Sequence, residues 1–268
     1  MEPRIIETDC LEDWLRTPPG QYLLAWEQQQ LDRIVADLFG FHALQLGLSA
    51  LDGLRSNRIP HRWTALTGLG KGQAAMVLDS TALPFPEQSL DLVILPHTLE
   101  LSPDPHATLR EVERVLVPEG RVVICGLNPA SLWGLRQQRA HVYRRLGLEK
   151  WFLPQAGEFI GYWRLRDWLR LLSFEVEGGR FGCYRPAVDS EPWLNRFAWM
   201  DKAGDRWWPI FGAVYLLVGV KRVHGMRLLE PGWKTARARA PQAVPSASSG
   251  RVAPLAEFNS PATNERKE

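Results

Sequence analysis

The stretch from Val77 to Gly126 restricts the possible fold more than any other part of the chain. It reads VLDSTALPFPEQSLDLVILPHTLELSPDPHATLREVERVLVPEGRVVICG. Ser89–Pro96 is a nearly continuous apolar run, which is typical of a central parallel strand covered on both faces. A helical pattern at Asp104–Leu116 and a strand pattern at Arg121–Cys125 follow it. Strand, helix and strand in this order predict a right-handed crossover within a parallel sheet.

Further elements are indicated upstream of this stretch. Pro18, Pro19 and Gly20 interrupt the chain before a predicted helix at about residues 21–39, whose packing stripe is Leu24, Leu31, Ile34, Val35 and Leu38. The predicted first, second and third strands are Phe41–Leu48, Trp63–Thr67 and Ala74–Leu78. Only six residues join the last two, whereas a parallel connection usually takes a dozen or more. Either a helix is reduced to a loop here, or the second strand lies elsewhere.

Composition predicts one globular domain, residues 1–230, followed by a different kind of segment. Of 268 residues 45% are hydrophobic, enough for one sizeable core. Residues 231–268 are rich in Pro, Ala, Ser and Gly, which predicts a disordered tail. This tail carries six Lys/Arg against three Glu, or +3, so the +2 of the whole chain leaves about −1 for the domain. A near-neutral domain gives no electrostatic case for a nucleic-acid partner.

Cysteine usage and the chain start bear on the compartment. The three cysteines, Cys10, Cys125 and Cys183, form no CxxC pair, so neither a disulfide framework nor a zinc site is indicated. Charged residues from Glu2 to Asp9 interrupt any apolar run of a secretory signal, and Trp207–Val220 is too short to span a bilayer. We therefore expect a cytoplasmic protein without a metal site or a transmembrane segment.

Tryptophans are frequent, twelve in all, and they crowd the second half of the chain. We expect an inserted lid at about residues 130–165 and 185–210, with a short helix at Pro192–Met200 that places Trp193, Phe197 and Met200 on one side. One interpretation is a second packing layer that closes a small domain. The other is an apolar pocket or membrane-facing surface for a hydrophobic acceptor, because indole suits such interfaces. Peripheral membrane contact is therefore an open alternative.

Three motifs within the central stretch resemble class I S-adenosylmethionine-dependent methyltransferases. They are LPF at 83–85, DLV at 91–93 and RVLVPEGRVVI at 114–124, in the order and spacing of that family. The resemblance is to the small-molecule branch related to quinone-pathway methyltransferases, and it extends faintly through Trp168–Val176 and Phe211–Val223. It implies a Rossmann-like α/β fold with a mostly parallel sheet, helices on both faces and an antiparallel last strand. It also implies S-adenosylmethionine as cofactor and a small molecule as substrate.

The resemblance assigns a cofactor site in which part of the usual pattern is missing. In the family an acidic residue and a glycine-rich turn follow the first strand, and here these positions hold Gln45, Gly47, Ser49 and Leu51. The family's ribose-binding acid has no counterpart, since no Asp or Glu lies between Gly53 and Leu78. The implied cofactor-binding residues are Gln45, Gly47, Leu48, Asp79, Ser80, Thr81 and Pro96. Asp79 takes the place of the acceptor for the adenine amino group, and a loop cap is its alternative role.

Two other features of the sequence leave alternatives open. His97 follows the fourth strand, where open α/β sheets bind ligands, so it is a candidate general base; a structural histidine is equally compatible. Gly68, Gly70 and Gly72 spell GxGxG, which is a weak pattern and more typical of a surface turn than of a displaced cofactor loop. Two hypotheses remain: a methyltransferase with a divergent cofactor turn, or a non-catalytic relative that keeps the fold as a binding module. The oligomeric state is left open.

Overall fold

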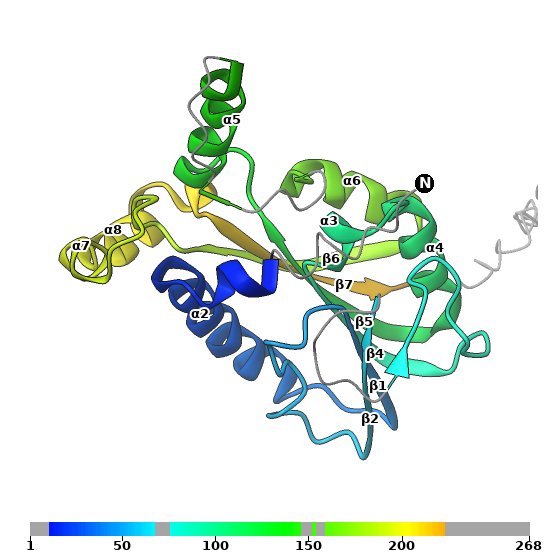
Figure 1. The fold of residues 1–268 in the computed structure, drawn as a ribbon. Coiled ribbons are helices and arrows are strands. Elements are labelled where there is room, and N and C mark those ends of the chain that lie inside the picture. Colours follow the sequence, from blue (N-terminus) through cyan, green and yellow to red (C-terminus); the bar gives the residue numbers. More distant parts are fainter. Residues whose placement is uncertain (1–10, 68–75, 146–151, 154–158, 223–268) are drawn as a thin grey trace, which may run out of the picture. The chain divides into compact units, whose positions relative to one another are not determined.

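A seven-stranded sheet forms the centre of the part of the chain that the structure describes (Figure 1). The structure is a computed structural model and describes residues 11–67, 76–145, 152–153 and 159–222. Its strands are β1 (His42–Leu46), β2 (His61–Leu66), β3 (Met76–Val77), β4 (Leu90–Pro96), β5 (Leu116–Leu127), β6 (Phe174–Gly182) and β7 (Val214–Lys221). They lie in the order β3-β2-β1-β4-β5-β7-β6, and β7 runs antiparallel to both of its neighbours. This confirms the expected mostly parallel sheet with an antiparallel last strand.

Helices cover both faces of this sheet, and the central strands alternate between two cores. Leu92 and Ile94 of β4 belong to the core beneath α2 (Pro18–Val35). Val93 and Leu95 belong to the core beneath α4 (Pro105–Val115) and α6 (Tyr162–Leu171). Successive side chains of a strand point to opposite faces, so a strand covered on both sides must be apolar throughout. This explains the continuous apolar run that marks β4 in the sequence.

The crossover helix α4 begins where the sequence predicts. The Asp104 side chain accepts a hydrogen bond from the Ala107 backbone N–H at 2.9 Å, and Pro105 occupies the first helical position. The cap satisfies one of the amide groups that a helix start leaves without a partner. A short helix, α3 (Thr98–Leu101), lies between β4 and this cap. The N-cap thus fixes the start of the helix that connects the carboxyl end of β4 to β5.

The N-terminal helix differs from the predicted one at both ends. Residues 11–15 are already helical, and α2 begins at Pro18 rather than after Gly20. Prolines are tolerated there because the first amide groups of a helix have no acceptor within it. The helix ends at Val35, four residues before the predicted end, and its buried apolar side chains are Leu23, Leu31 and Val35, whereas Leu24 is only half-buried. The predicted packing stripe thus contacts the core, with Leu24, Ile34 and Leu38 half-buried against it, and the fully buried Leu23 joins it.

The connection from β1 to β2 contains turns and no helix, over residues 47–60, all of which the structure describes. Its apolar side chains, Leu48, Leu51, Leu54 and Ile59, fill the core beneath α2. β2 pairs with β3 in parallel, with Ala65 opposite Met76, so the second strand lies where it was predicted. Residues 68–75, which join these strands and hold the GxGxG pattern, are outside the described residues. The apolar side chains of the β1–β2 loop thus fill the part of the core that a helix could fill at this position.

The segment between β6 and β7 forms two helices where one was predicted. They are α7 (Glu191–Arg196) and α8 (Trp199–Trp207), followed by the 3-10 turn η1 (Pro209–Phe211). The predicted single helix at 192–200 is wrong because the chain leaves helical geometry at Phe197, whose φ and ψ are −94° and 14°. Leu194 is the buried residue of α7, while Trp193 is exposed. Figure 1 shows α7 and α8 beside each other, set off from the strands.

The described residues bear only in part on two predictions, the disordered C-terminal tail and the absence of a transmembrane segment. The predicted basic tail, residues 231–268, lies outside the described residues. Among the helices of the described part, none is long and apolar enough to cross a membrane. The helix α5 (Leu132–Arg145) belongs to the predicted lid. Trp133 lies in its first turn and is fully buried.

Candidate functional site

The turn after β1 is held by the side chain of Gln45. This residue is 1% exposed, and its amide nitrogen donates to the backbone oxygens of Leu48, at 3.1 Å, and Leu51. Its amide oxygen accepts a hydrogen bond from the Gly53 N–H at 2.8 Å. A carboxylate could take over only the last of these bonds, because an ionised carboxylate has no proton to donate. The amide therefore suits a turn that directs two carbonyls and one N–H toward the same buried side chain.

Gly47 brings the ends of β1 and β4 together more closely than another residue could. Its φ is +119°, a conformation that glycine adopts without strain. A Cβ atom at this position would collide with the Thr98 hydroxyl and lie 3.1 Å from the Pro96 carbonyl oxygen. The Thr98 hydroxyl in turn donates to the Leu46 carbonyl. The structure thus places Gly47 and Pro96, two of the predicted cofactor-binding residues, side by side at the carboxyl edge of the sheet.

The positions of the two missing glycines have opposite environments. Leu51 is 1% exposed and packs in the core beneath α2, as does Leu48. Their side chains are therefore directed into the core, so for Leu48 the backbone is the part left to contact a ligand. Ser49 is half-buried, and its hydroxyl donates to Glu12 Oε1 at 3.0 Å. This bond ties the turn to the helical residues 11–15.

Asp79 lies exposed just after β3, with part of its carboxylate unused. Its Oδ1 accepts hydrogen bonds from the N–H and the hydroxyl of Thr81, at 2.8 and 2.7 Å. These bonds from the Thr81 side chain and backbone lower the pKa of Asp79, which favours the ionised carboxylate. All of its bonds to described residues use Oδ1, which leaves Oδ2 available to a donor. Asp79 therefore combines the loop-cap role with a remaining acceptor.

Ser80, by contrast, belongs to a buried hydroxyl cluster. It is 3% exposed, accepts a hydrogen bond from the Thr108 hydroxyl at 3.1 Å, and lies 3.4 Å from the Ser102 hydroxyl. Ser102 and Thr108 are themselves 2.8 Å apart. The cluster joins the loop after β3 to the first turn of α4. The Ser80 side chain thus anchors the loop that presents Asp79 and Thr81.

His97 is buried between two carboxylates. Its Nε2 lies 3.0 Å from Glu27 Oε1 on α2, and its Nδ1 lies 2.8 Å from Glu100 Oε2 on α3. Burial alone would lower the pKa of His97, but the charges of Glu27 and Glu100 outweigh it and raise the pKa well above its usual value. Both ring nitrogens are engaged, which describes an imidazolium that donates twice. The arrangement favours a structural role, and the general-base role stays a prediction.

Sequence reasoning gave no role to Glu27 or Glu100. The second oxygen of Glu27, Oε2, is buried and has no hydrogen-bond partner among the described residues. Glu100 Oε1 accepts a hydrogen bond from the Leu127 N–H, which links α3 to the end of β5. A glutamate at a buried position of an amphipathic helix is the signal that could have identified Glu27, since carboxylates are almost never fully buried unless paired. The cluster connects α2, β4 and β5 directly beside Gly47 and Pro96.

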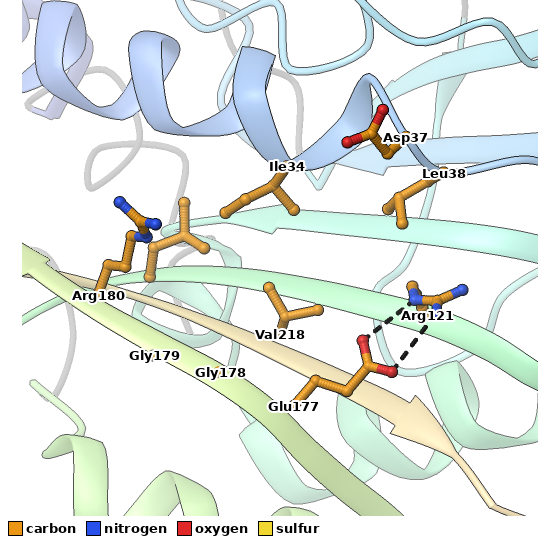
Figure 2. A pocket seen from close by; sticks show the side chains of 10 residues that line it. Ile34, Asp37, Leu38, Arg121, Glu177, Gly178, Gly179, Arg180 and Val218 are labelled. Atoms are coloured by element: carbon orange, nitrogen blue, oxygen red, sulfur yellow. Dashed lines mark hydrogen bonds and ion pairs between the residues drawn. The ribbon is translucent and has the colours of Figure 1, made fainter.

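A cavity of about 380 Å³ lies on the α2 side of the sheet, away from these residues (Figure 2). Ile34 and Leu38 border it on one side and Val218 on the other, and Arg121 and Glu177 form an ion pair across its end at 3.3 Å. Arg121 is the first residue of β5 that pairs with β7, and Leu127 is the last, so the two lie at opposite ends of this pairing. This cavity is therefore separate from the predicted cofactor site.

Comparison with known proteins bears directly on this arrangement. Residues 62–124 match the family model described as a methyltransferase domain. The malonyl-[acyl-carrier protein] O-methyltransferase of Halorhodospira halophila (strain DSM 244 / SL1) is 39% identical over 64 residues, 24% of this chain and 22% of that protein. This chain belongs to the class I S-adenosylmethionine-dependent methyltransferase family. The match covers β2 to β5, which includes Asp79, Ser80, Thr81, Pro96 and His97.

Two further comparisons cover a longer part of the chain, one with a related sequence and one with a solved structure. The uncharacterized protein YafS of Escherichia coli (strain K12) is 34% identical over 174 residues, 64% of this chain and 67% of that protein. A chain from the complex between the Haloferax volcanii Trm112 methyltransferase activator and the putative methyltransferase superposes with a TM-score of 0.53 at 16% identity. That superposition covers 82% of this chain and 99% of the other, and it supports the fold.

Proposed function

We propose that this chain transfers a methyl group from S-adenosylmethionine to a small molecule. The observation that carries the proposal is the pairing of Gly47 with Pro96 at the carboxyl edge of the sheet, where this family binds its cofactor. Because residue 47 is a glycine, no Cβ atom lies between the turn after β1 and the end of β4. An exposed carboxylate, Asp79, follows strand β3, which is separated from β1 by β2, and its Oδ2 is available. These features fit a cofactor that carries a donor amino group.

Each residue would have a defined part in such a site. The backbone at Gly47 and Leu48 would border the amino-acid portion of the cofactor, because no side chain stands there. Asp79 Oδ2 would accept a hydrogen bond from an exocyclic amino group, and Ser80 would hold its loop in place. S-adenosylmethionine, when bound, supplies an electrophilic methyl group on a positively charged sulfur. The acceptor must bring a lone pair and lose a proton, and alignment by the site supplies most of the catalysis that such a transfer needs.

A hydrophobic acceptor remains our expectation for the substrate class. Trp14, Trp133 and Phe152 form a buried aromatic cluster in the same core as Leu127, with ring centroids 5.4 to 6.2 Å apart. Leu127 ends β5, next to the end of β4, so the core that holds this cluster extends to the carboxyl end of β5. The indole N–H of Trp14 is buried and has no partner among the described residues. An aromatic wall of this kind favours an apolar acceptor over a highly charged one.

A second function is supported by the way the first turn is filled. Gln45 binds the turn internally, and Leu51 packs in the core where the family has a glycine. No acidic residue lies between Gly53 and Leu78 to bind ribose. These observations favour a protein that retains the methyltransferase fold as a binding module without turnover.

Equilibrium binding separates the two functions. Isothermal titration with S-adenosylmethionine and with its demethylated product should give saturable binding to the wild-type protein. Asp79→Asn should weaken it about tenfold, since a hydrogen bond to a charged group contributes about 1.5–3 kcal/mol. Glu87→Gln, which neutralises an exposed acid in the same loop, should leave affinity unchanged. Absence of saturable binding at millimolar ligand would overturn the methyltransferase proposal and favour the binding module.

A further inference from the structure

Large apolar side chains are exposed along the segment between β6 and β7, on α7, on α8 and in the turn that follows α8. Four of the five exposed tryptophans of the described residues lie in this segment. Together with two aliphatic or aromatic neighbours they are 42 to 73% exposed: Trp193, Trp199, Trp207, Trp208, Ile210 and Phe211. We call these six residues the indole surface. Exposed apolar groups that gather in this way mark interaction sites on soluble proteins.

The helix α8 has an inner and an outer side. With about 3.6 residues per turn, Trp199, Arg206 and Trp207 fall on the outer side, and Lys202 lies at its edge, where it borders a cavity together with Asp205. Asp201 and Gly204 fall on the other, and both contact the rest of the protein. The outer side therefore combines indole rings with cations.

The inner side of α8 is fixed by specific contacts. Asp201 accepts hydrogen bonds from the Tyr22 hydroxyl on α2 and from Arg185 Nε, the latter at 2.9 Å. Gly204 lies against the Tyr184 ring so closely that a Cβ atom would collide with it. Since these contacts set the rotation of the helix, Trp199 and Trp207 are held outward by the fold.

Cations also accompany the indoles on α7. Arg196 is exposed, and its guanidinium carbon lies 5.6 Å from the centre of the Trp193 ring. Trp193 also stacks on Phe197, with ring centroids 6.1 Å apart. Asp201 pairs with Arg185 and Asp189 pairs with Arg136 on α5, so the charges that remain on the segment are Arg196, Lys202 and Arg206 against Glu191 and Asp205. An excess of cations around exposed indoles is complementary to an anionic surface.

We propose that the indole surface docks this protein on a lipid bilayer that contains anionic phospholipid. Trp is the side chain that favours the boundary between acyl chains and headgroups, and interleaved Lys and Arg add attraction to anionic headgroups. A cavity of about 480 Å³ beside α8 is bordered by Asp201, Lys202 and Asp205, and none of the six residues lines it. A lipid interface takes up exposed indoles without a cavity. The docking is independent of whether the protein binds S-adenosylmethionine.

Vesicle sedimentation with the full chain tests this docking. The wild-type protein should sediment with vesicles of two parts phosphatidylcholine to one part phosphatidylglycerol, and less with pure phosphatidylcholine. A double variant, Trp199→Ala with Trp207→Ala, should lower the partition coefficient about tenfold or more, because two indoles no longer enter the interface. The variant keeps residues 231–268 with their six Lys/Arg, so the difference isolates the indoles.

A matched control separates docking from general apolar exposure. Trp163, on α6, is 59% exposed, close to the 60% of Trp199. Trp163→Ala should bind vesicles as the wild type does, and thermal unfolding should show that all variants are folded. Equal binding by the double variant and the wild type, or no binding by the wild type, would overturn the proposal. A wild-type dimer that the double variant turns into a monomer, without vesicle binding, would assign the surface to self-association instead.

Discussion

His97 at the end of β4 and Glu27 in the middle of α2 form a buried contact of 3.0 Å between Nε2 and Oε1. The two residues are 70 positions apart, and both side chains are at most 1% exposed. Glu100 contacts the other ring nitrogen, so one imidazolium holds a helix and a strand end together. The same strand end carries Pro96, which lies against Gly47. The ion pair therefore fixes the frame of the predicted cofactor site.

Removing the charge of Glu27 should destabilise the protein most at low pH. Breaking one partner of a buried ion pair costs about 3–5 kcal/mol, so Glu27→Gln should lower the free energy of unfolding by that order. The folded-state pKa of His97 is raised above its unfolded value of about 6.5. Stability from the pair is thus fully present below that value and is lost as pH rises through the folded pKa. Urea unfolding of both proteins from about pH 6 to about pH 9 measures the difference.

Glu87→Gln makes the same chemical change at an exposed position and should have little effect at any pH. A difference between wild type and Glu27→Gln that stays constant or grows with pH would contradict an imidazolium at His97.

Gln45→Glu should destabilise the chain although it brings the family's charge back to this position. The carboxylate cannot donate to the carbonyls of Leu48 and Leu51, and its charge would lie beside both oxygens. Two buried acceptors without donors predict a loss of about 1–3 kcal/mol or more. Chemical unfolding of this variant, with the exposed Gln29→Glu as control, tests the claim. An unchanged midpoint would show that the turn does not depend on the amide.

Gly47→Ala should disturb both folding and the predicted cofactor site. The positive φ costs about 1–3 kcal/mol for a residue with a Cβ, and the collision with Thr98 adds to it. Gly178→Ala is the matched control, because a Cβ there would meet nothing within 4 Å. Thermal unfolding of the two variants should separate them clearly. If Gly47→Ala unfolds at the wild-type temperature, the close approach of β1 and β4 is not as tight as described.

Lys221 at the end of β7 should contribute to stability through the end of α4. Its ammonium group donates to the Leu116 carbonyl at 3.0 Å and lies 3.1 Å from Glu113 Oε1. A cation at a helix C-terminus also interacts favourably with the helix dipole. Lys221→Met should lower the free energy of unfolding by about 1–3 kcal/mol, and the exposed Lys202→Met by much less. Equal effects would contradict a specific role for Lys221.

Local pattern was sufficient for β4 and for the start of α4, but it did not predict α3 or the start of β5 at Leu116. Burial on both faces forces β4 to be apolar throughout, and Asp104 with Pro105 marks the start of α4, so both are readable from neighbouring residues. The end of α2 and the break between α7 and α8 were not, because several helix lengths satisfy the same spacing of apolar residues. Which length occurs depends on what the helix packs against.

The candidate site divides in the same way. Gly47 and Asp79 could be named from the sequence because a strand end and a family motif precede them. The partner of His97 could not, since Glu27 reaches it only after α2 has packed across the sheet. The donor role of Gln45 was likewise hidden, because the directions of the Leu48 and Leu51 carbonyls are properties of the folded turn.

The sequence by itself determined the parallel strands, the crossover helix and the family, since these rest on periodicity and on spacing along the chain. Only the tertiary structure decided that Leu51 packs in the core, that His97 lies between two carboxylates, and that the tryptophans of α8 face outward. The physical reason is that burial and pairing depend on groups distant in sequence. A residue's identity limits its possible partners, but the packing of α2, β6 and α8 selects among them.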